Sequence, residues 1–150
     1  KPIEFLEKHF GKSGTYYFYV VRGIHNSEVK PNRITKSVAA EHTFDENLTS
    51  EIFMQERLET IAAELDRRLK KHKIAGKTVT LKIKYSDFTQ QTRSKTLPYF
   101  ISDKSLLFDT VKELLFQERM KDSVRLLGIS LSNLNTEIKK TIVVQLKFDF

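Results

Sequence analysis

Lys77-Thr78-Val79-Thr80-Leu81-Lys82-Ile83-Lys84-Tyr85 alternates strictly between polar and apolar residues, and the turn signal Ser86-Asp87-Phe88 follows it. A period of two is typical of a strand with one buried face. The apolar set is expected to face a core, while the threonines and lysines face outward. Residues 92–100 read as a further strand that ends near Pro98, so the two segments predict a hairpin.

The flanking sequence completes the pattern. Residues 34–44 alternate, and residues 48–73 carry apolar side chains at helical spacing. A second helix follows residue 101, with Ser102 or Asp103 as its N-cap, and residues 124–131 predict a last strand. The inward positions of the two helices are expected to be Ile52, Leu58, Ile61, Ala62, Leu65 and Leu69 in the first, and Leu107, Val111, Leu114 and Leu115 in the second.

The order of elements is therefore β-α-β-β-α-β, an α+β fold. Its four-stranded, mainly antiparallel sheet needs both helices on one face, because neither helix can bury its apolar stripe alone. The opposite face, rich in Thr, Ser, Lys and Arg, would stay uncovered, and function is expected there.

Residues 1–23 differ from the rest. They predict a helical hairpin with Gly11-Lys12-Ser13-Gly14 as an exposed turn. Such turn amides can approach a phosphate, although glycine pairs four residues apart are also common by chance. The polar residues 24–33 read as a linker.

Composition limits the classes of function. The chain has 150 residues, 39% of them hydrophobic, a net charge of +7 and no cysteine. The charge favours a polyanionic partner, nucleic acid before a membrane surface, with a merely solvated basic surface as the alternative. Disulfides and thiolate metal sites are excluded. No apolar run approaches the ~20 residues that cross a bilayer. Because the chain begins at Lys1, without a methionine, it is expected to be a piece of a longer protein.

The end of the chain allows two interpretations. Residues 132–140 are polar and predict a tether. Residues 141–150 alternate, which is typical of a last strand. They also contain Gln145-Leu146-x-Phe148-x-Phe150, the spacing of a short docking peptide with large apolar anchors.

Several stretches, in this order, resemble the C-terminal part of a bacterial Y-family translesion DNA polymerase, closest to the DNA polymerase IV group. They are Phe10-Gly11-Lys12-x-Gly14, Arg22-Gly23-Ile24, Lys36-Ser37-x-x-x-Glu41-x-Thr43-Phe44, Lys82-x-Lys84-Tyr85-Ser86-Asp87-Phe88, Val124-Arg125-Leu126-Leu127-Gly128 and Gln145-Leu146. The resemblance runs from about Phe5 to Phe150. Each piece is weak alone, and the ordered set is specific.

The resemblance implies that residues 1–23 end the thumb domain, that 24–33 are the linker and that 34–131 form the little finger. Residues 132–140 would be a tether and 141–150 a sliding-clamp-binding tail. In this family the little finger binds DNA phosphates rather than bases. The residues implied for DNA binding are Thr35, Lys36, Ser37, Thr43, Thr92, Arg93, Ser94, Lys95 and Arg125, of which alternation allows only half of 92–95 to face DNA. Glu41, awkward beside phosphate, is expected to pair with a neighbouring basic residue or to shape the strand. Those implied for the clamp are Gln145, Leu146, Phe148 and Phe150.

The resemblance also bears on activity and partners. The parent would be a DNA-directed DNA polymerase active in translesion synthesis and DNA repair in the bacterial cytoplasm. Its Mg²⁺ ions would be held by a palm domain upstream, so this piece is expected to be non-catalytic, without a cofactor and monomeric. Asp87, Asp103 and Asp109 read as turn, cap and helix-surface residues. The expected partners are primer–template duplex DNA and the clamp, the polymerase β subunit, and no membrane.

Two rival functions belong to other classes. One is a free-standing binder of single-stranded nucleic acid with ferredoxin-like strand order, which would stack bases on aromatic residues of its sheet. Phe44 and Tyr85 fall in the inward set, which disfavours it. The other is an adaptor that uses its tail to bind a partner and does not contact DNA.

Overall fold

The computed structural model describes residues 1–136, and residues 137–150, which include the expected clamp-binding tail, lie outside the described part. The chain divides by its internal contacts into two units, Lys1–Arg33 and the residues from Ile34 onward. In the described part, no helix combines the length and the apolar character needed to cross a membrane.

The first unit is a helical hairpin of α1 (Ile3–Phe10) and α2 (Lys12–Val20). Gly11 alone makes the turn, with φ 56°, a left-handed conformation that glycine adopts without strain. Gly14 lies inside α2, where an added Cβ would come within 2.3 Å of the Leu6 backbone. The prediction that Gly11 to Gly14 form one exposed turn is therefore wrong. The second glycine lets the two helices approach closely.

The second unit contains a four-stranded antiparallel sheet within the described residues. Its strands are β1 (Ser37–Leu48), β2 (Gly76–Tyr85), β3 (Gln90–Ile101) and β4 (Val124–Leu134). Their order across the sheet is β1-β4-β2-β3, and every neighbouring pair is antiparallel. The predicted β-α-β-β-α-β fold is confirmed.

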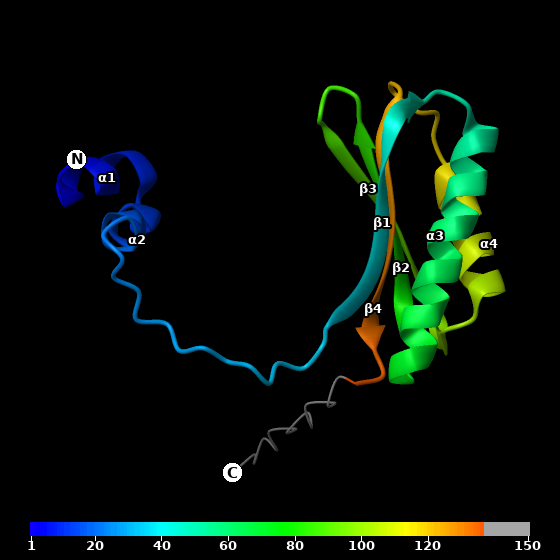
Figure 1. Ribbon diagram of the computed structural model, residues 1–150, viewed down its shortest axis with the longest axis horizontal. Helices are drawn as coiled ribbons and strands as arrows, with labels where there is room; N and C mark the ends of the chain where they lie inside the picture. The colour runs from blue at the N-terminus through cyan, green and yellow to red at the C-terminus, as the bar shows by residue number, and fades with distance from the viewer. Residues whose placement is uncertain (137–150) are drawn as a thin grey trace, which may run out of the picture. The chain divides into compact units, whose positions relative to one another are not determined.

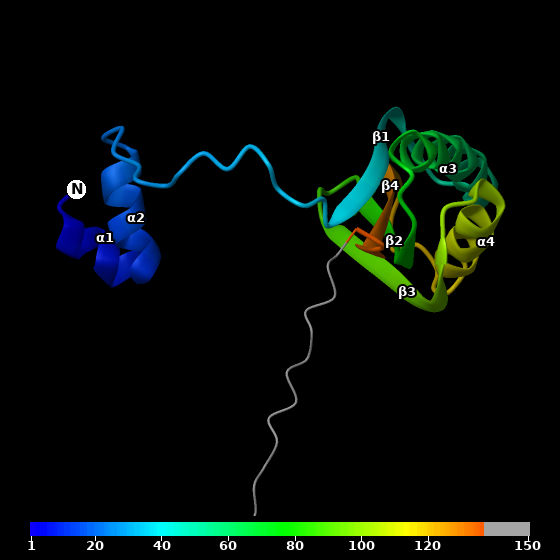
Figure 2. The same ribbon diagram turned by 90° about the horizontal axis from the view of Figure 1, so that it is seen from below.

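The helices α3 (Glu51–His72) and α4 (Lys104–Leu115) lie side by side on one face of this sheet (Figures 1 and 2). Asp103 caps α4, because its Oδ1 accepts from the Ser105 backbone N at 2.8 Å. The core between the layers is formed by fully buried side chains of both helices and of the two central strands, including Leu58, Ile61, Leu65, Leu107, Val111, Leu115, Val79, Leu81, Ile83, Leu127 and Leu131.

One predicted core residue is exposed. Ile52, in the first turn of α3, is 72% exposed, whereas Met54 is fully buried. Two residues correspond to about 200° around a helix, so Ile52 points away from the stripe that Met54, Leu58 and Leu65 share. The helical spacing of the buried residues was predicted correctly, but the assignment of Ile52 to the core was wrong.

The strand boundaries also differ from the predicted ones. β1 begins at Ser37 rather than at residue 34, and β4 continues to Leu134, so residues 132–134 are strand rather than tether. β3 passes through Pro98 and ends at Ile101. A proline lacks a backbone N–H, which costs little on β3 because this strand is at the edge of the sheet.

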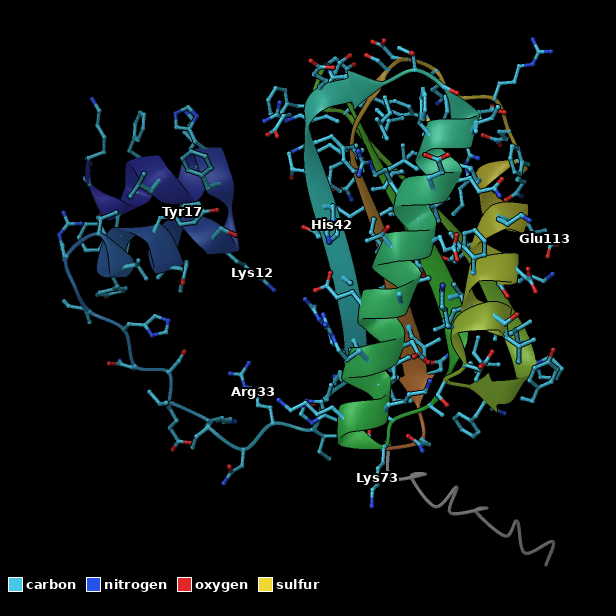
Figure 3. All side chains as sticks on the ribbon, turned by 45° about the vertical axis from the view of Figure 1, so that its right-hand side comes forward. Lys12, Tyr17, Arg33, His42, Lys73 and Glu113 are labelled. Atoms are coloured by element: carbon cyan, nitrogen blue, oxygen red, sulfur yellow. The ribbon has the colours of Figure 1, made fainter. Side chains whose placement is uncertain are left out.

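A polar network holds α3 against β1. His42 points from β1 toward α3 (Figure 3), and its Nε2 lies 2.9 Å from Glu64 Oε2. Arg68 pairs with Glu64 and donates to the Ala39 carbonyl. The hydrogen bond with His42 lowers the pKa of the Glu64 carboxyl below its usual value, with further help from Arg68, while partial burial acts in the opposite direction. The first half of β1 is thereby tied to the long helix.

Candidate nucleic-acid interface

The sheet has a second face, on the side away from α3 and α4 (Figure 1). Residues paired across neighbouring strands share a face. Val79, Leu81 and Ile83 pair with Leu131, Ile129 and Leu127 on the buried side. The alternate positions therefore form what we call the open face: Ser37, Ala39, Glu41 and Thr43 of β1, Leu126, Gly128, Ser130 and Ser132 of β4, Thr78, Thr80, Lys82 and Lys84 of β2, and Gln90, Thr92, Ser94 and Thr96 of β3.

Hydroxyl groups dominate the open face and bond to each other across strands. Thr78 Oγ1 lies 2.9 Å from Thr96 Oγ1, and Thr80 Oγ1 lies 2.8 Å from Ser94 Oγ. Each hydroxyl has one proton and two acceptor lone pairs, so a paired hydroxyl keeps capacity for another partner. Short side chains of this kind suit contact with phosphate oxygens, which carry no sequence information.

Six of the nine residues implied for DNA binding lie at or next to this face along β1 and β3, and a seventh, Arg125, lies at one end of it. Ser37, Thr43, Thr92 and Ser94 occupy open-face positions. Thr35 and Lys36 precede β1 rather than lying in it, and the Thr35 carbonyl accepts a hydrogen bond from Thr136 Oγ1 at 3.2 Å. These two residues are exposed where the chain enters the sheet.

Arg93 does not belong to the open face, where a role in DNA binding would require it to lie. Arg93 is only 6% exposed. Its NH1 donates to the carbonyls of Leu114, Leu115 and Glu118 at 2.9, 2.7 and 3.1 Å. A guanidinium is well placed there, because the C-terminal carbonyls of a helix lack partners and carry partial negative charge. Arg93 is a structural residue that fixes β3 to the end of α4.

Lys95 also points toward the helices and away from the open face. It pairs across the sheet with buried Val79, and its Nζ lies 2.6 Å from Glu113 Oε2 of α4. Glu113 is labelled on α4 in Figure 3. Of residues 92–95, the open face therefore receives the two hydroxyl side chains and neither of the two basic ones.

Arg125 lies at an irregularity where β4 pairs with β2, between the pairs Lys84↔Leu126 and Tyr85↔Val124. The guanidinium carbon of Arg125 and Lys84 Nζ each lie 5.0 Å from the centre of the Phe88 ring. Phe88 is 61% exposed and has φ 66°, which is uncommon for a residue with a large side chain. In residues 1–136, no carboxylate pairs with Lys84 or Arg125.

We call this group, Lys84, Phe88 and Arg125, the basic corner. The sequence indicates Arg125 as a site residue and Phe88 as part of a turn, but no sequence pattern brings the three residues together. Cations over an aromatic face are attracted to it by roughly 0.5–1 kcal/mol at exposed sites. The ring therefore holds two positive groups at one end of the open face.

The middle of the open face carries an ion pair. Lys82 Nζ of β2 lies 2.8 Å from Glu41 Oε2 of β1. Between these strands runs β4, and the residue that pairs with both Glu41 and Lys82 is Gly128. Of the two roles expected for Glu41, pairing with a basic residue or shaping the strand, the pairing is confirmed.

The aspartates named in the sequence have the structural roles predicted for them. Asp87 Oδ1 accepts from the Thr89 backbone N at 2.9 Å within the β2–β3 turn, Asp103 caps α4, and Asp109 is exposed on α4. The described residues hold no group of three or more His, Cys, Asp or Glu side chains that could bind a metal ion.

Comparison with known proteins identifies the family. The impB/mucB/samB family C-terminal domain matches residues 35–148. The chain belongs to this family. The match confirms the resemblance inferred from the ordered sequence motifs.

Curated relatives give the same result. The chain is 39% identical over 138 residues to "DNA polymerase IV 2" of Agrobacterium fabrum, and 43% identical over 148 residues to "DNA polymerase IV" of Leptospira interrogans serovar copenhageni. It is 37% identical over 144 residues to "DNA polymerase IV" of Akkermansia muciniphila. These matches cover 91%, 91% and 95% of the chain, but only 39%, 40% and 40% of the relatives. The chain therefore spans about two fifths of the length of these relatives.

Proposed function

We propose that this chain is the DNA-gripping C-terminal part of a DNA polymerase IV-like translesion polymerase. The observation that carries the proposal is the open face, lined with hydroxyl and lysine side chains, in a member of a family whose relatives are named DNA polymerase IV. In this assignment residues 1–23 are the end of the thumb domain and the sheet unit is the little finger. Residues 24–33 are the linker between them.

The open face is proposed to hold the backbone of the primer–template duplex. Its hydroxyls offer hydrogen bonds to phosphate oxygens, and the basic corner offers two charges. Direct reading of bases relies on Arg, Asn, Gln or Lys at base edges. The register-paired positions of this face hold no Asn or Arg, one Gln, Gln90, and two lysines, of which Lys82 is paired with Glu41 and Lys84 lies over the Phe88 ring. Binding without sequence preference follows, as a polymerase that copies any template requires.

The position of the aromatic residues supports this proposal over a single-strand binder. Such binders stack bases on exposed aromatic rings of the sheet. Here Tyr85 is 2% exposed, and its hydroxyl donates to Gln91 Oε1 at 2.6 Å. Phe44 packs against the core. Phe88 lies in the turn between β2 and β3, and the exposed rings of Tyr99 and Phe100 lie at the far end of β3. The register-paired positions of the open face therefore carry no row of rings for successive bases.

The polymerase chemistry of the parent is proposed to lie in a palm domain outside these residues, where carboxylates hold two Mg²⁺ ions that stabilise the attacking and leaving oxygens. This chain would contribute grip and position rather than a chemical step. The tail residues 141–150 are proposed to bind the sliding clamp, so that the polymerase stays near the primer end. As an adaptor without DNA contact, the chain would have no use for the basic corner.

Titration of the chain with short duplexes of different sequence tests the proposal. We expect similar affinities for all sequences, and a fall of tenfold or more between 50 and 200 mM salt, because the contacts are to phosphates. Lys84→Ala and Arg125→Ala should each weaken binding to every duplex and reduce the salt slope by about one unit.

Lys95→Ala is the matched control. It removes one positive charge from β3 on the helix side, where Lys95 pairs with Glu113. It should change affinity much less than either variant at the basic corner. Discrimination among sequences above about 2 kcal/mol would indicate direct base readout and contradict the proposal.

A further inference from the structure

The Glu41–Lys82 pair crosses the middle of the open face, directly over the backbone of β4. An added Cβ on Gly128 would lie 2.9 Å from Glu41 Cβ and 3.4 Å from Glu41 Oε2. The glutamate side chain therefore lies flat on this glycine while it reaches Lys82 on the next strand. Any larger residue at Gly128 would push the carboxylate away from its partner.

The pair neutralises a charge that the face would otherwise present. The side chain of Lys82 is 32% exposed and that of Glu41 is 49% exposed, so the pair is open to solvent. Among the register-paired residues of this face, Glu41 is the one carboxylate and Lys82 and Lys84 are the two lysines. A carboxylate is an unexpected residue at the centre of a face that binds phosphates.

The chemistry of the pair suggests why the carboxylate is there. A carboxylate and a phosphodiester both present anionic oxygens that accept from an ammonium group. An exposed ion pair is weak and screened by salt, so an incoming phosphate can displace one partner. Thr92 pairs with Lys82 across the strands, and the hydroxyl of Thr80, which already bonds with Ser94 Oγ, keeps capacity for one further partner, so both can contact the other phosphate oxygens.

We propose that Glu41 is a built-in competitor for phosphate. It occupies Lys82 in the free protein, it must be displaced when the DNA backbone reaches the middle of the open face, and it thereby limits how tightly the duplex is held. The inference rests on the proposed function, because it assigns a role within the same DNA-binding face. Its consequence is a grip that a translesion polymerase can release: the basic corner binds first, and the centre of the face adds little net affinity.

The test is the affinity of Glu41→Gln for duplex DNA. Glutamine keeps the size of the side chain and removes its charge, so Lys82 becomes available to a phosphate. One added phosphate contact steepens the salt slope by about 0.9, which corresponds to an increase in affinity of up to about fifteenfold at 50 mM salt and about fourfold at 200 mM. The double variant Glu41→Gln/Lys82→Gln should lose this gain and bind no tighter than the unmodified chain.

Glu113→Gln is the matched control. It also removes a carboxylate from an exposed pair with a lysine, but on the helix side of the sheet. Both variants raise the net charge by one, so a general charge effect would strengthen binding equally in the two. Melting temperatures of all variants should stay close to that of the unmodified chain, because the pair is exposed.

The outcomes distinguish a failure of the competitor role from a failure of DNA binding itself. A gain for Glu41→Gln that exceeds that of Glu113→Gln and depends on Lys82 supports the inference. If the unmodified chain binds DNA but Glu41→Gln binds equally or more weakly, or only as tightly as Glu113→Gln, the competitor role is wrong. If neither the unmodified chain nor any variant binds duplex DNA, the proposed function itself fails.

Discussion

Replacing Arg93 with methionine should lower the free energy of unfolding of this chain by about 2–4 kcal/mol. The guanidinium donates to the carbonyls of Leu114 and Leu115 at the end of α4 and to that of Glu118 beyond it, and Arg93 is almost fully buried. Methionine fills similar space but leaves these acceptors without a donor, and each unsatisfied buried group costs about 1–3 kcal/mol. Urea denaturation followed by circular dichroism measures the change.

Lys95→Met is the control for this prediction. It removes a positive charge two residues along the same strand, from an exposed pair with Glu113, and should cost no more than about 1 kcal/mol. If Arg93→Met unfolded at the same urea concentration as the unmodified chain while binding DNA much more weakly, Arg93 would be a DNA contact after all. The structural role assigned to Arg93 from its burial would then be wrong.

Changing Leu146 and Phe148 together to alanine should abolish detectable binding to a ring-shaped sliding clamp. These residues lie outside the described part of the structure, and their role is inferred from the spacing Gln145-Leu146-x-Phe148-x-Phe150. A short peptide that orders on binding is expected to have an affinity on the order of micromolar. Each large apolar anchor contributes about 1.5–3 kcal/mol when buried. The loss of two anchors therefore weakens micromolar binding below what can be detected. Surface plasmon resonance with immobilised clamp measures the binding of the variant and of the unmodified chain.

Deletion of residues 141–150 distinguishes the docking peptide from a last strand of the fold. If these residues dock on the clamp, the shortened chain should melt like the intact one and no longer bind the clamp. If they instead complete the sheet unit, their removal should expose core residues and lower the melting temperature sharply. The second result would contradict the tail assignment.

The fold was predictable because its two periods are clean. Val79, Leu81 and Ile83 alternate with polar residues and are fully buried, and the stripe from Leu58 to Leu69 repeats at helical spacing. The ends of elements were less predictable. Ser132 and Asn133 read as tether because they are polar, yet they belong to a central strand whose open face tolerates polar side chains, and Leu134 beyond them is buried.

The site was predictable only in part, since composition does not say which way a long basic side chain points. Thr92 to Lys95 alternate, and either half was compatible with the pattern. The unpaired carbonyls at the end of α4 decide the question, because they hold Arg93 on the helix side. That contact joins residues more than twenty positions apart, so no local pattern could have shown it.

The basic corner was missed for a different reason. Phe88 stands in a turn and adopts a positive φ that favours glycine or asparagine, so the sequence gives no sign of how its ring is directed. Lys84 had been predicted to point outward, and Arg125 had been named from the resemblance. That Lys84 and Arg125 both contact the Phe88 ring follows only from the structure.

The most direct test of the central claim is a titration of the chain, with labelled threonine methyl groups, against a short duplex. Threonines sample both sides of the sheet unit: Thr43, Thr78, Thr80, Thr92 and Thr96 lie on the open face, whereas Thr60 is exposed on α3. If the open face holds the DNA backbone, the methyl signals of the first group should shift in proportion to bound duplex, equally for unrelated sequences, and that of Thr60 should not. Shifts concentrated at Thr60, with the open-face threonines unchanged, would contradict the account.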